Sequence, residues 1–356
     1  INTIICTHAQ KEISYFQKYF FFGGYRMKWG CFQIKNKQAM KKKLQLFSLS
    51  IFLFASCQKE HEELSSAVQT QQLVASADNC ATEGLIEKVF NDCGVVRKYY
   101  IQLPVGYHPD STYPLLMAFH GKGSGAKNKA CAWKERIGAW IDENRFIAVY
   151  GRAYNDMTWF IDSTCLENVD EECYVQNIRN QMTSLYKIDT QHIYWMGTSN
   201  GGGLCLDLSR KIHWVSAITS IACYPWSELS IEDIPQLPLF QIHGALDGTI
   251  NYDGVEFNCL DFVHADSACQ QWASHNGCLI APLCSSAMID GHVLNRSSWC
   301  GPKPALFAGC LRCILRKEVL HYRLEGIGHQ VYEEIGIIPG YKERLNDDIF
   351  SFFKRH

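Results

Sequence analysis

The sequence predicts an α/β domain with a doubly wound, mostly parallel sheet. Short apolar runs such as Leu115–Phe119 and Phe146–Tyr150 are typical of strands that are buried on both faces. Segments with helical spacing separate these runs, and a parallel sheet is connected by such an alternation of strand and helix. A serine in the pattern G-x-S-x-G, at 197–201, directly follows another predicted strand. These three observations together predict the fold class.

The composition limits what the protein can be. The chain has 356 residues, of which 47% are hydrophobic and 20% are charged, and its net charge is -2. Such a chain can bury a substantial core. Its charge gives no electrostatic reason to expect nucleic acid or an anionic membrane surface as a partner. The 17 cysteines indicate an oxidising compartment and several disulfides.

The N-terminal part has the features of a targeting segment. Residues 1–39 fit no pattern and are interpreted as translated sequence upstream of a start at Met40. Residues 40–57 combine three lysines, an apolar run too short to span a bilayer and a Ser-Cys pair, and they resemble a bacterial lipoprotein signal. We therefore expect lipidation at Cys57, with an ordinary cleaved signal peptide as the alternative. Residues 58–79 are polar and predict a flexible tether.

These features predict a secreted protein on the outer surface of a Gram-negative bacterium. Its contact with the membrane would then be made only through the lipid on Cys57. The folded domain is expected over 80–356.

The elements of this domain are predicted in order along the chain. Its strands are expected at Val96–Leu103, Leu115–Phe119, Phe146–Tyr150, His192–Met196, Val215–Ala222, Leu239–His243 and Val319–Leu324. Apolar residues at steps of three and four predict helices at Cys131–Glu143, Cys173–Tyr186, from Gly202 onwards, and at Asn346–Phe353.

Residues 276–318 interrupt this alternation. They contain five cysteines and little periodicity, which predicts an insertion held by disulfides before the last strand. We expect Cys278 to pair with Cys310 or Cys313 there, and Cys80 to pair with Cys93 near the start of the domain. Cys310 and Cys313 have a C-x-x-C spacing, but no second pair accompanies them, so no metal site is expected.

The G-x-S-x-G serine, Ser199, lies between a predicted strand and a predicted helix. This placement is typical of the nucleophile elbow of α/β-hydrolases, in which a sharp turn presents the serine hydroxyl at the carboxyl edge of the sheet. A serine hydroxyl needs a base beside it, and the base needs an acid that orients it. In this fold the chain order is serine, acid, histidine.

Two later loops supply these partners. Asp247 follows the buried strand Leu239–His243 and is the predicted acid, with Asp253 as a weaker alternative. His329 follows the last predicted strand on a loop with glycines and is the predicted base. His321 lies inside that strand and is expected to be a packed side chain.

The anion formed during acyl transfer needs two N–H donors. One is expected to be the backbone N–H of Asn200, directly after the serine. The second is expected on the glycine-containing loop after Leu115–Phe119, from Lys122 or, alternatively, Gly121.

The chain resembles a family of secreted esterases that includes polyhydroxybutyrate depolymerases, feruloyl esterases and acetyl-xylan esterases. The resemblance is carried by segments such as Asp189–Tyr194 running into Gly197–Gly202, His243–Asp247 and Gly326–His329, and it spans about 99–329. It implies the same nucleophile, acid and base. Gln330 stands where the family often has a tryptophan, and this difference bears on the substrate.

We therefore expect a serine esterase that acts on feruloyl or acetyl esters of plant polysaccharide. It would need no metal and no organic cofactor. A polyester depolymerase, a serine peptidase and a catalytically inactive binding protein on the same fold are the alternatives.

Overall fold

The computed structural model describes residues 21–22, 25–26, 84–123, 129–154, 157–161, 169–278, 281–300 and 317–356. The chain divides into two units, Ile1–Ala77 and Asp78–His356. In the first, β1 (Phe21–Phe22) pairs antiparallel with β2 (Tyr25–Arg26). The predicted signal peptide, the lipidation at Cys57 and the tether at 58–79 lie outside the described residues. Of the helices in the described ranges, none is long and apolar enough to span a membrane.

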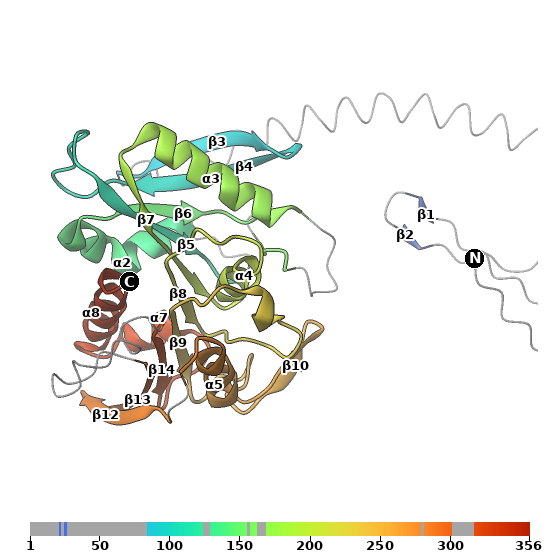
Figure 1. Cartoon of the computed structure of the whole chain (residues 1–356), viewed down its shortest axis with the longest axis vertical. Helices are drawn as coiled ribbons and strands as arrows, with labels where there is room; N and C mark the ends of the chain where they lie inside the picture. Colours follow the sequence, from blue (N-terminus) through green and yellow to red (C-terminus); the bar gives the residue numbers. More distant parts are fainter. Residues whose placement is uncertain are drawn as a thin grey trace, which may run out of the picture. The chain divides into compact units, whose positions relative to one another are not determined.

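The second unit is built around a ten-stranded sheet (Figure 1). Neighbouring strands follow the order β12-β13-β14-β9-β8-β7-β5-β6-β4-β3, and those from β14 to β6 run parallel. Antiparallel strands extend both ends. The strands are β3 (Ile86–Asp92), β4 (Val95–Gln102), β5 (Tyr113–Phe119), β6 (Ile147–Gly151), β7 (Ile188–Thr198), β8 (Ala217–Ile221), β9 (Leu239–Gly244), β12 (Leu283–Ile289), β13 (His292–Trp299) and β14 (Val319–Leu324).

Helices cover both faces of this sheet, as a doubly wound topology requires. One apolar cluster joins the sheet to α2, α7 and α8, and another joins it to α3, α4 and α5. The predicted fold class is therefore confirmed. The helices are α2 (Lys129–Asn144), α3 (Glu171–Leu185), α4 (Asn200–Leu208), α5 (Ala265–His275), α7 (Val331–Ile335) and α8 (Tyr341–Lys354).

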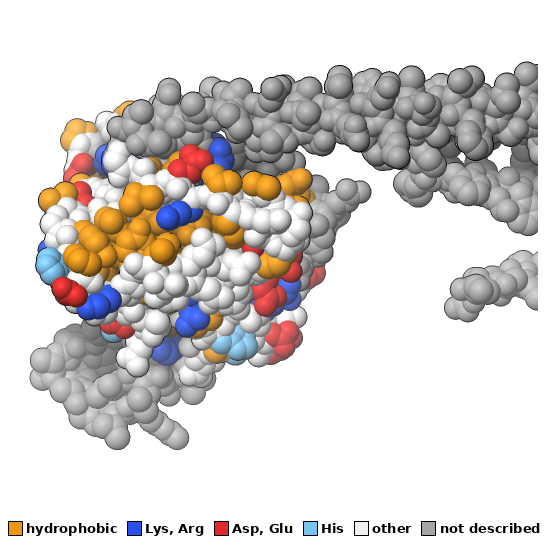
Figure 2. Space-filling model, turned by 90° about the horizontal axis from the view of Figure 1, so that it is seen from above, with side chains coloured by type: hydrophobic (Ala, Val, Ile, Leu, Met, Phe, Trp, Pro, Cys, Tyr) orange, Lys and Arg blue, Asp and Glu red, His pale blue; other side chains and the backbone are white. Residues whose placement is uncertain are grey.

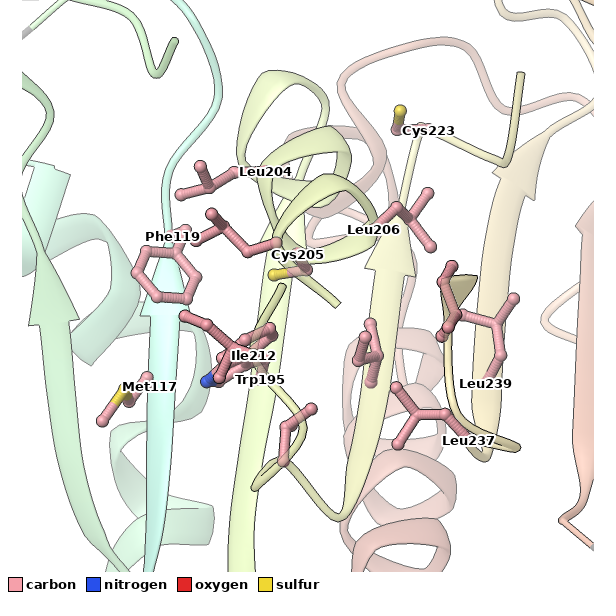
Figure 3. Packing of buried hydrophobic residues seen from close by; sticks show 14 of the residues in the cluster. Met117, Phe119, Trp195, Leu204, Cys205, Leu206, Ile212, Cys223, Leu237 and Leu239 are labelled. Atoms are coloured by element: carbon pink, nitrogen blue, oxygen red, sulfur yellow. The ribbon is translucent and has the colours of Figure 1, made fainter. Parts of the chain in front are cut away.

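Helix α4 is held firmly because its side chains enter the core. Figure 3 shows Leu204 and Cys205 of α4 beside Phe119 of β5 and Trp195 of β7. All four side chains are almost fully buried. A fully buried leucine contributes roughly 2 kcal/mol, so this packing fixes the N-terminus of α4 against the central strands.

The predicted insertion at 276–318 was only partly right. Its residues 283–299 form a hairpin, β12 and β13, that extends the main sheet next to β14. The residues of β12 are mostly exposed, so the apolar runs that reveal buried strands are missing there. Cys278 pairs with Cys300, whereas Cys310 and Cys313, its predicted partners, lie outside the described residues.

The other predicted disulfide was also wrong. Cys93, in the turn between β3 and β4, pairs with Cys173 in the first turn of α3 and not with Cys80. Beside this disulfide, Arg97 and Glu171 form a buried ion pair with a nitrogen–oxygen distance of 2.7 Å. The corner between the hairpin and α3 is therefore held by a covalent bond and a buried charge pair.

A small hairpin, β10 (Val255–Phe257) and β11 (Leu260–Phe262), precedes α5. In the ten-stranded sheet, β3 is the edge strand at the end opposite β12. Figure 2 looks down on the top of Figure 1 and shows hydrophobic side chains gathered on that face. Val89 and Val96, on β3 and β4, are among the exposed apolar residues of the chain.

Candidate active site

Ser199 stands on a strained turn between β7 and α4. Its backbone has φ 51° and ψ −121°, a conformation that residues other than glycine rarely adopt. The turn is possible because its neighbours are glycines. A Cβ atom on Gly197 would lie 2.2 Å from the carbonyl oxygen of Gly201, and one on Gly201 would lie 2.3 Å from the carbonyl oxygen of Phe119. The sequence G-x-S-x-G therefore fits this turn for steric reasons.

Asp247 lies on the loop after β9 and is almost fully buried. Its Oδ1 atom accepts hydrogen bonds from the backbone N–H groups of Thr249 and Ile250, at 2.8 and 2.9 Å. Its Oδ2 atom accepts one from Nδ1 of His329 at 2.7 Å. The loop thus fixes the carboxylate and leaves one oxygen facing the histidine.

His329 completes a chain of hydrogen bonds. It follows β14, and its Nε2 atom lies 2.8 Å from Oγ of Ser199. A carboxylate only accepts, so Nδ1 carries the proton and Nε2 is free to accept the serine proton. The structure thus brings together Ser199, Asp247 and His329 from the ends of β7, β9 and β14.

The two weaker candidates lie elsewhere. The side chain of Asp253 is 88% exposed, and an oxygen of its carboxylate lies 3.3 Å from Nε2 of His264. His321 is buried and its Nε2 lies 2.6 Å from the hydroxyl oxygen of Tyr252. Neither side chain joins the hydrogen-bonded chain at Ser199.

A second histidine, which the sequence did not single out, contacts the same carboxylate. Nε2 of His243 lies 3.1 Å from Oδ2 of Asp247 and donates to the carbonyl oxygen of Ile250 at 2.8 Å. Its Nδ1 atom accepts from the side-chain amide of Gln241 at 3.1 Å. Burial tends to raise the pKa of Asp247, but the hydrogen bonds from His243 and His329 outweigh it and hold this pKa below its ordinary value.

The loop after β5 reaches Ser199. A Cβ atom on Gly121 would lie 3.3 Å from Cβ of Ser199, so this backbone packs against the serine. The side chain of His120 anchors this loop through two hydrogen bonds. Its Nδ1–H donates to the carbonyl oxygen of Gly121 at 2.8 Å, and its Nε2 accepts from the N–H of Ala153 at 3.2 Å. Burial lowers the pKa of His120 to about 3, which keeps this imidazole neutral.

This anchoring also orients the next N–H group. In a trans peptide the C=O and N–H bonds point in opposite directions. Because His120 binds the carbonyl of Gly121, the N–H of Lys122 points away from His120. On the other side of the serine, the N–H of Asn200 begins α4, where a helix leaves its first N–H groups without partners inside the helix.

The side chain of Asn200 has a role that sequence reasoning missed. Its Oδ1 accepts from the N–H of Trp159 at 2.7 Å, and its Nδ2 donates to the carbonyl oxygen of the same residue at 3.1 Å. The indole N–H of Trp159 donates in turn to the carbonyl oxygen of His120. The asparagine thus links the elbow to the loop that carries Gly121.

Ser199 and His329 face a cavity of about 610 Å³. Its apolar lining residues include Ile161, Cys223, Ile250, Phe257, Leu260 and Phe262. Its polar and charged lining residues include Lys129, Arg136, Gln330 and Glu333. The hydrogen-bonded serine therefore faces a cavity with both apolar and charged lining residues.

Among the described residues, one group of side chains comes close enough together to hold a metal ion, formed by Asp92, Cys93 and Cys173. Its two sulfur atoms are bonded to each other in a disulfide, so they are not thiolate ligands.

A comparison with known proteins by sequence gives two relatives that are named as esterases. The chain is 22% identical over 198 residues to feruloyl esterase B of Piromyces equi, covering 52% of this chain and 37% of that protein. It is 28% identical over 170 residues to the bifunctional acetylxylan esterase/xylanase XynS20E of Neocallimastix patriciarum, covering 46% of this chain and 23% of that protein. The chain thus spans well under half the length of these relatives. No protein-family model matches the chain.

One solved structure superposes on the chain with a TM-score above 0.5. The acylaminoacyl peptidase of Pyrococcus horikoshii superposes with a TM-score of 0.51 at 11% identity, covering 76% of this chain and 41% of that chain. The acetyl xylan esterase from Aspergillus awamori gives a TM-score of 0.45 at 13% identity, covering 70% and 99%. The expected resemblance to feruloyl and acetyl-xylan esterases is confirmed at the level of sequence, and the α/β-hydrolase fold is confirmed by the architecture.

Proposed function

We propose that this protein is a serine carboxylester hydrolase that acts on feruloyl or acetyl esters of plant polysaccharide. The observation that carries the proposal is the chain of hydrogen bonds from Ser199 through His329 to Asp247 at the wall of a cavity. The sequence relatives support the ester as substrate, because one is named a feruloyl esterase and the other an acetylxylan esterase/xylanase.

The reaction would proceed in two steps. In the first, Oγ of Ser199 attacks the ester carbonyl carbon while Nε2 of His329 takes its proton. Asp247 holds the imidazole and stabilises its charged form. When the tetrahedral intermediate collapses, the bond to the alcohol oxygen breaks, His329 gives its proton to that oxygen, and an acyl-serine remains.

In the second step water replaces the alcohol. His329 takes a proton from the water, whose oxygen attacks the acyl carbon, and the bond to Oγ then breaks as Ser199 regains its proton. In both steps the N–H groups of Asn200 and Lys122 would bind the oxyanion, and each such donor is worth roughly 3–4 kcal/mol in hydrolases.

The apolar lining of the cavity supports an aromatic acyl group. Phe257, Leu260 and Phe262 line it, and a phenolic ring would bury its apolar faces there. We propose feruloyl esters as the better substrate on this ground, with acetyl esters as smaller alternatives.

We also propose that the protein works outside the cell. The disulfides Cys93–Cys173 and Cys278–Cys300 support an oxidising compartment. A lipid on Cys57 remains a prediction from the sequence.

The test is hydrolysis of a panel that contains methyl ferulate, acetylated xylan, polyhydroxybutyrate and a peptide anilide. We expect turnover of the first two, and Ser199→Ala should lower kcat/KM by at least about 10⁴-fold. Full activity of this variant would overturn the assignment of the nucleophile.

Labelling by a phosphonate serine probe separates an enzyme from an inactive binding protein. We expect stoichiometric labelling of the wild-type protein and none of Ser199→Ala. No labelling of a correctly folded wild-type protein would favour the binding protein, and preferential cleavage of the anilide would favour a peptidase.

A further inference from the structure

One wall of the cavity carries more positive charge than ester hydrolysis requires. It is formed by one face of α2, because Lys129, Ala132 and Arg136 are spaced by three and four residues and all line the cavity. The neighbouring face of the helix enters the core with Trp133 and Ile137. The core packing therefore fixes the direction in which the two cations point.

The positive charge on this wall is only partly neutralised. Arg136 forms an ion pair with Glu333 and lies over the ring of Tyr332, at 5.3 Å from its centre. For Lys129 no acceptor lies within reach among the described residues. Burial and the neighbouring Arg136 lower the pKa of Lys129, and the negative charge of Glu333, which is already paired with Arg136, offsets these effects only in part.

The wall lies on the side where the alcohol of the ester must leave. His329 gives its proton to the leaving oxygen, so the alcohol lies beside His329 in the reaction proposed above. The chain runs from His329 directly into Gln330–Glu333, which lines the cavity together with Lys129 and Arg136. The apolar residues that suit the acyl group are a different set.

We propose that Lys129 and Arg136 form a subsite for a carboxylate on the alcohol part of the substrate, as in an ester carried by a uronic acid unit. The subsite rests on the proposed esterase function and makes it more specific. An anion beside Lys129 would offset both its burial and its repulsion by Arg136, and Ala132 between the two cations leaves room for it.

The test compares two ferulate esters that differ mainly in charge, carboxymethyl ferulate and 2-hydroxyethyl ferulate. Lys129→Met should lower kcat/KM for the charged ester about tenfold, the worth of one charge-assisted hydrogen bond, and leave the neutral ester within about twofold. Lys134→Met on the same helix is the matched control, because Lys134 does not line the cavity, and it should change neither ester. The ratio of kcat/KM for the charged ester to kcat/KM for the neutral ester should fall in 0.5 M NaCl, because salt at this concentration screens charges over a short distance.

Each other outcome has one meaning. An equal loss for both esters in Lys129→Met would overturn the subsite, because the lysine would then act on the oxyanion common to all esters. No loss for either ester would overturn it as well, while the esterase function would stand. If the wild-type protein hydrolyses neither ester, the proposed function fails, and the subsite fails with it.

Discussion

At the scale of single residues, Asp247 is held by more groups than its role beside His329 requires. Two backbone N–H groups fix one of its oxygens, and His243 shares the other with His329. His243 is fully buried and is itself oriented by Gln241. We regard His243 as a positioning residue that acts on the serine through Asp247 and His329.

Substitution of His243 tests this role. His243→Leu removes a donor to Asp247, so we expect kcat to fall at least about tenfold, equivalent to 1.4 kcal/mol, with little change in KM. Steady-state kinetics on a ferulate ester measure both parameters.

His243→Gln is the matched variant, because its amide N–H can take the place of Nε2–H. It should recover most of the lost kcat. If both variants lose activity in proportion to their loss of thermal stability, His243 would be only a packing residue.

The sequence was sufficient to predict that Ser199, Asp247 and His329 lie together, because each follows a strongly apolar strand and the fold fixes their order. It was not sufficient for His243, which lies inside such a strand as a polar exception. A buried histidine four residues before the predicted acid was the available signal. The side-chain contacts of Asn200 left no signal, since its partner Trp159 lies far away in the sequence.

At the scale of elements, the turn from β7 into α4 depends on close backbone contacts. A Cβ atom on Gly201 would lie 2.3 and 2.5 Å from the carbonyl oxygens of Phe119 and His120. These are backbone atoms of a central strand and of the loop that carries Gly121, so they cannot move without disturbing the sheet. The glycine thus sets the distance between the elbow and that loop.

Gly201→Ala should therefore lower the free energy of unfolding by about 3 kcal/mol or more. Gly248→Ala, beside the candidate acid, is the control: a Cβ atom there meets nothing within 4 Å, and we expect a change of about 0.5 kcal/mol or less. Urea denaturation measures both. Similar stabilities for the two variants would contradict the steric argument.

The elements that the sequence predicted best are those buried on both faces. β9 and β14 match their predicted ranges to within one residue. β12 was missed because its residues are mostly exposed, and β3 because its exposed and half-buried residues alternate without a strong apolar run. An edge strand is defined by its partner, and a single sequence does not contain that information.

At the scale of the whole molecule, buried histidines make stability depend on pH. Burial lowers the pKa of His120 to about 3, and it also lowers that of His321. In the unfolded chain both would titrate near 6.5, so below that pH the unfolded state binds more protons than the folded state. Their contribution to stability is present above pH 6.5 and is lost as the pH falls.

We therefore expect the free energy of unfolding to decrease between pH 6.5 and about 4, by up to ~1.4 kcal/mol per pH unit for each histidine. Denaturation at pH 7, 6 and 5 measures the slope. His120→Asn should flatten it, because the amide N–H can still reach the carbonyl of Gly121 but does not titrate. An unchanged slope in this variant would mean that His120 is not one of the groups responsible.

The order of the strands also has a consequence for the time course of folding. The two hydrogen bonds of His329 join it to residues 82 and 130 positions earlier, across parallel strands that pair only through long connections. Such distant contacts form slowly, because much of the chain must be ordered before they close. A refolding sample should regain its helical signal well before it regains turnover. Recovered activity would then report the last stage of assembly, when β14 takes its place beside β9.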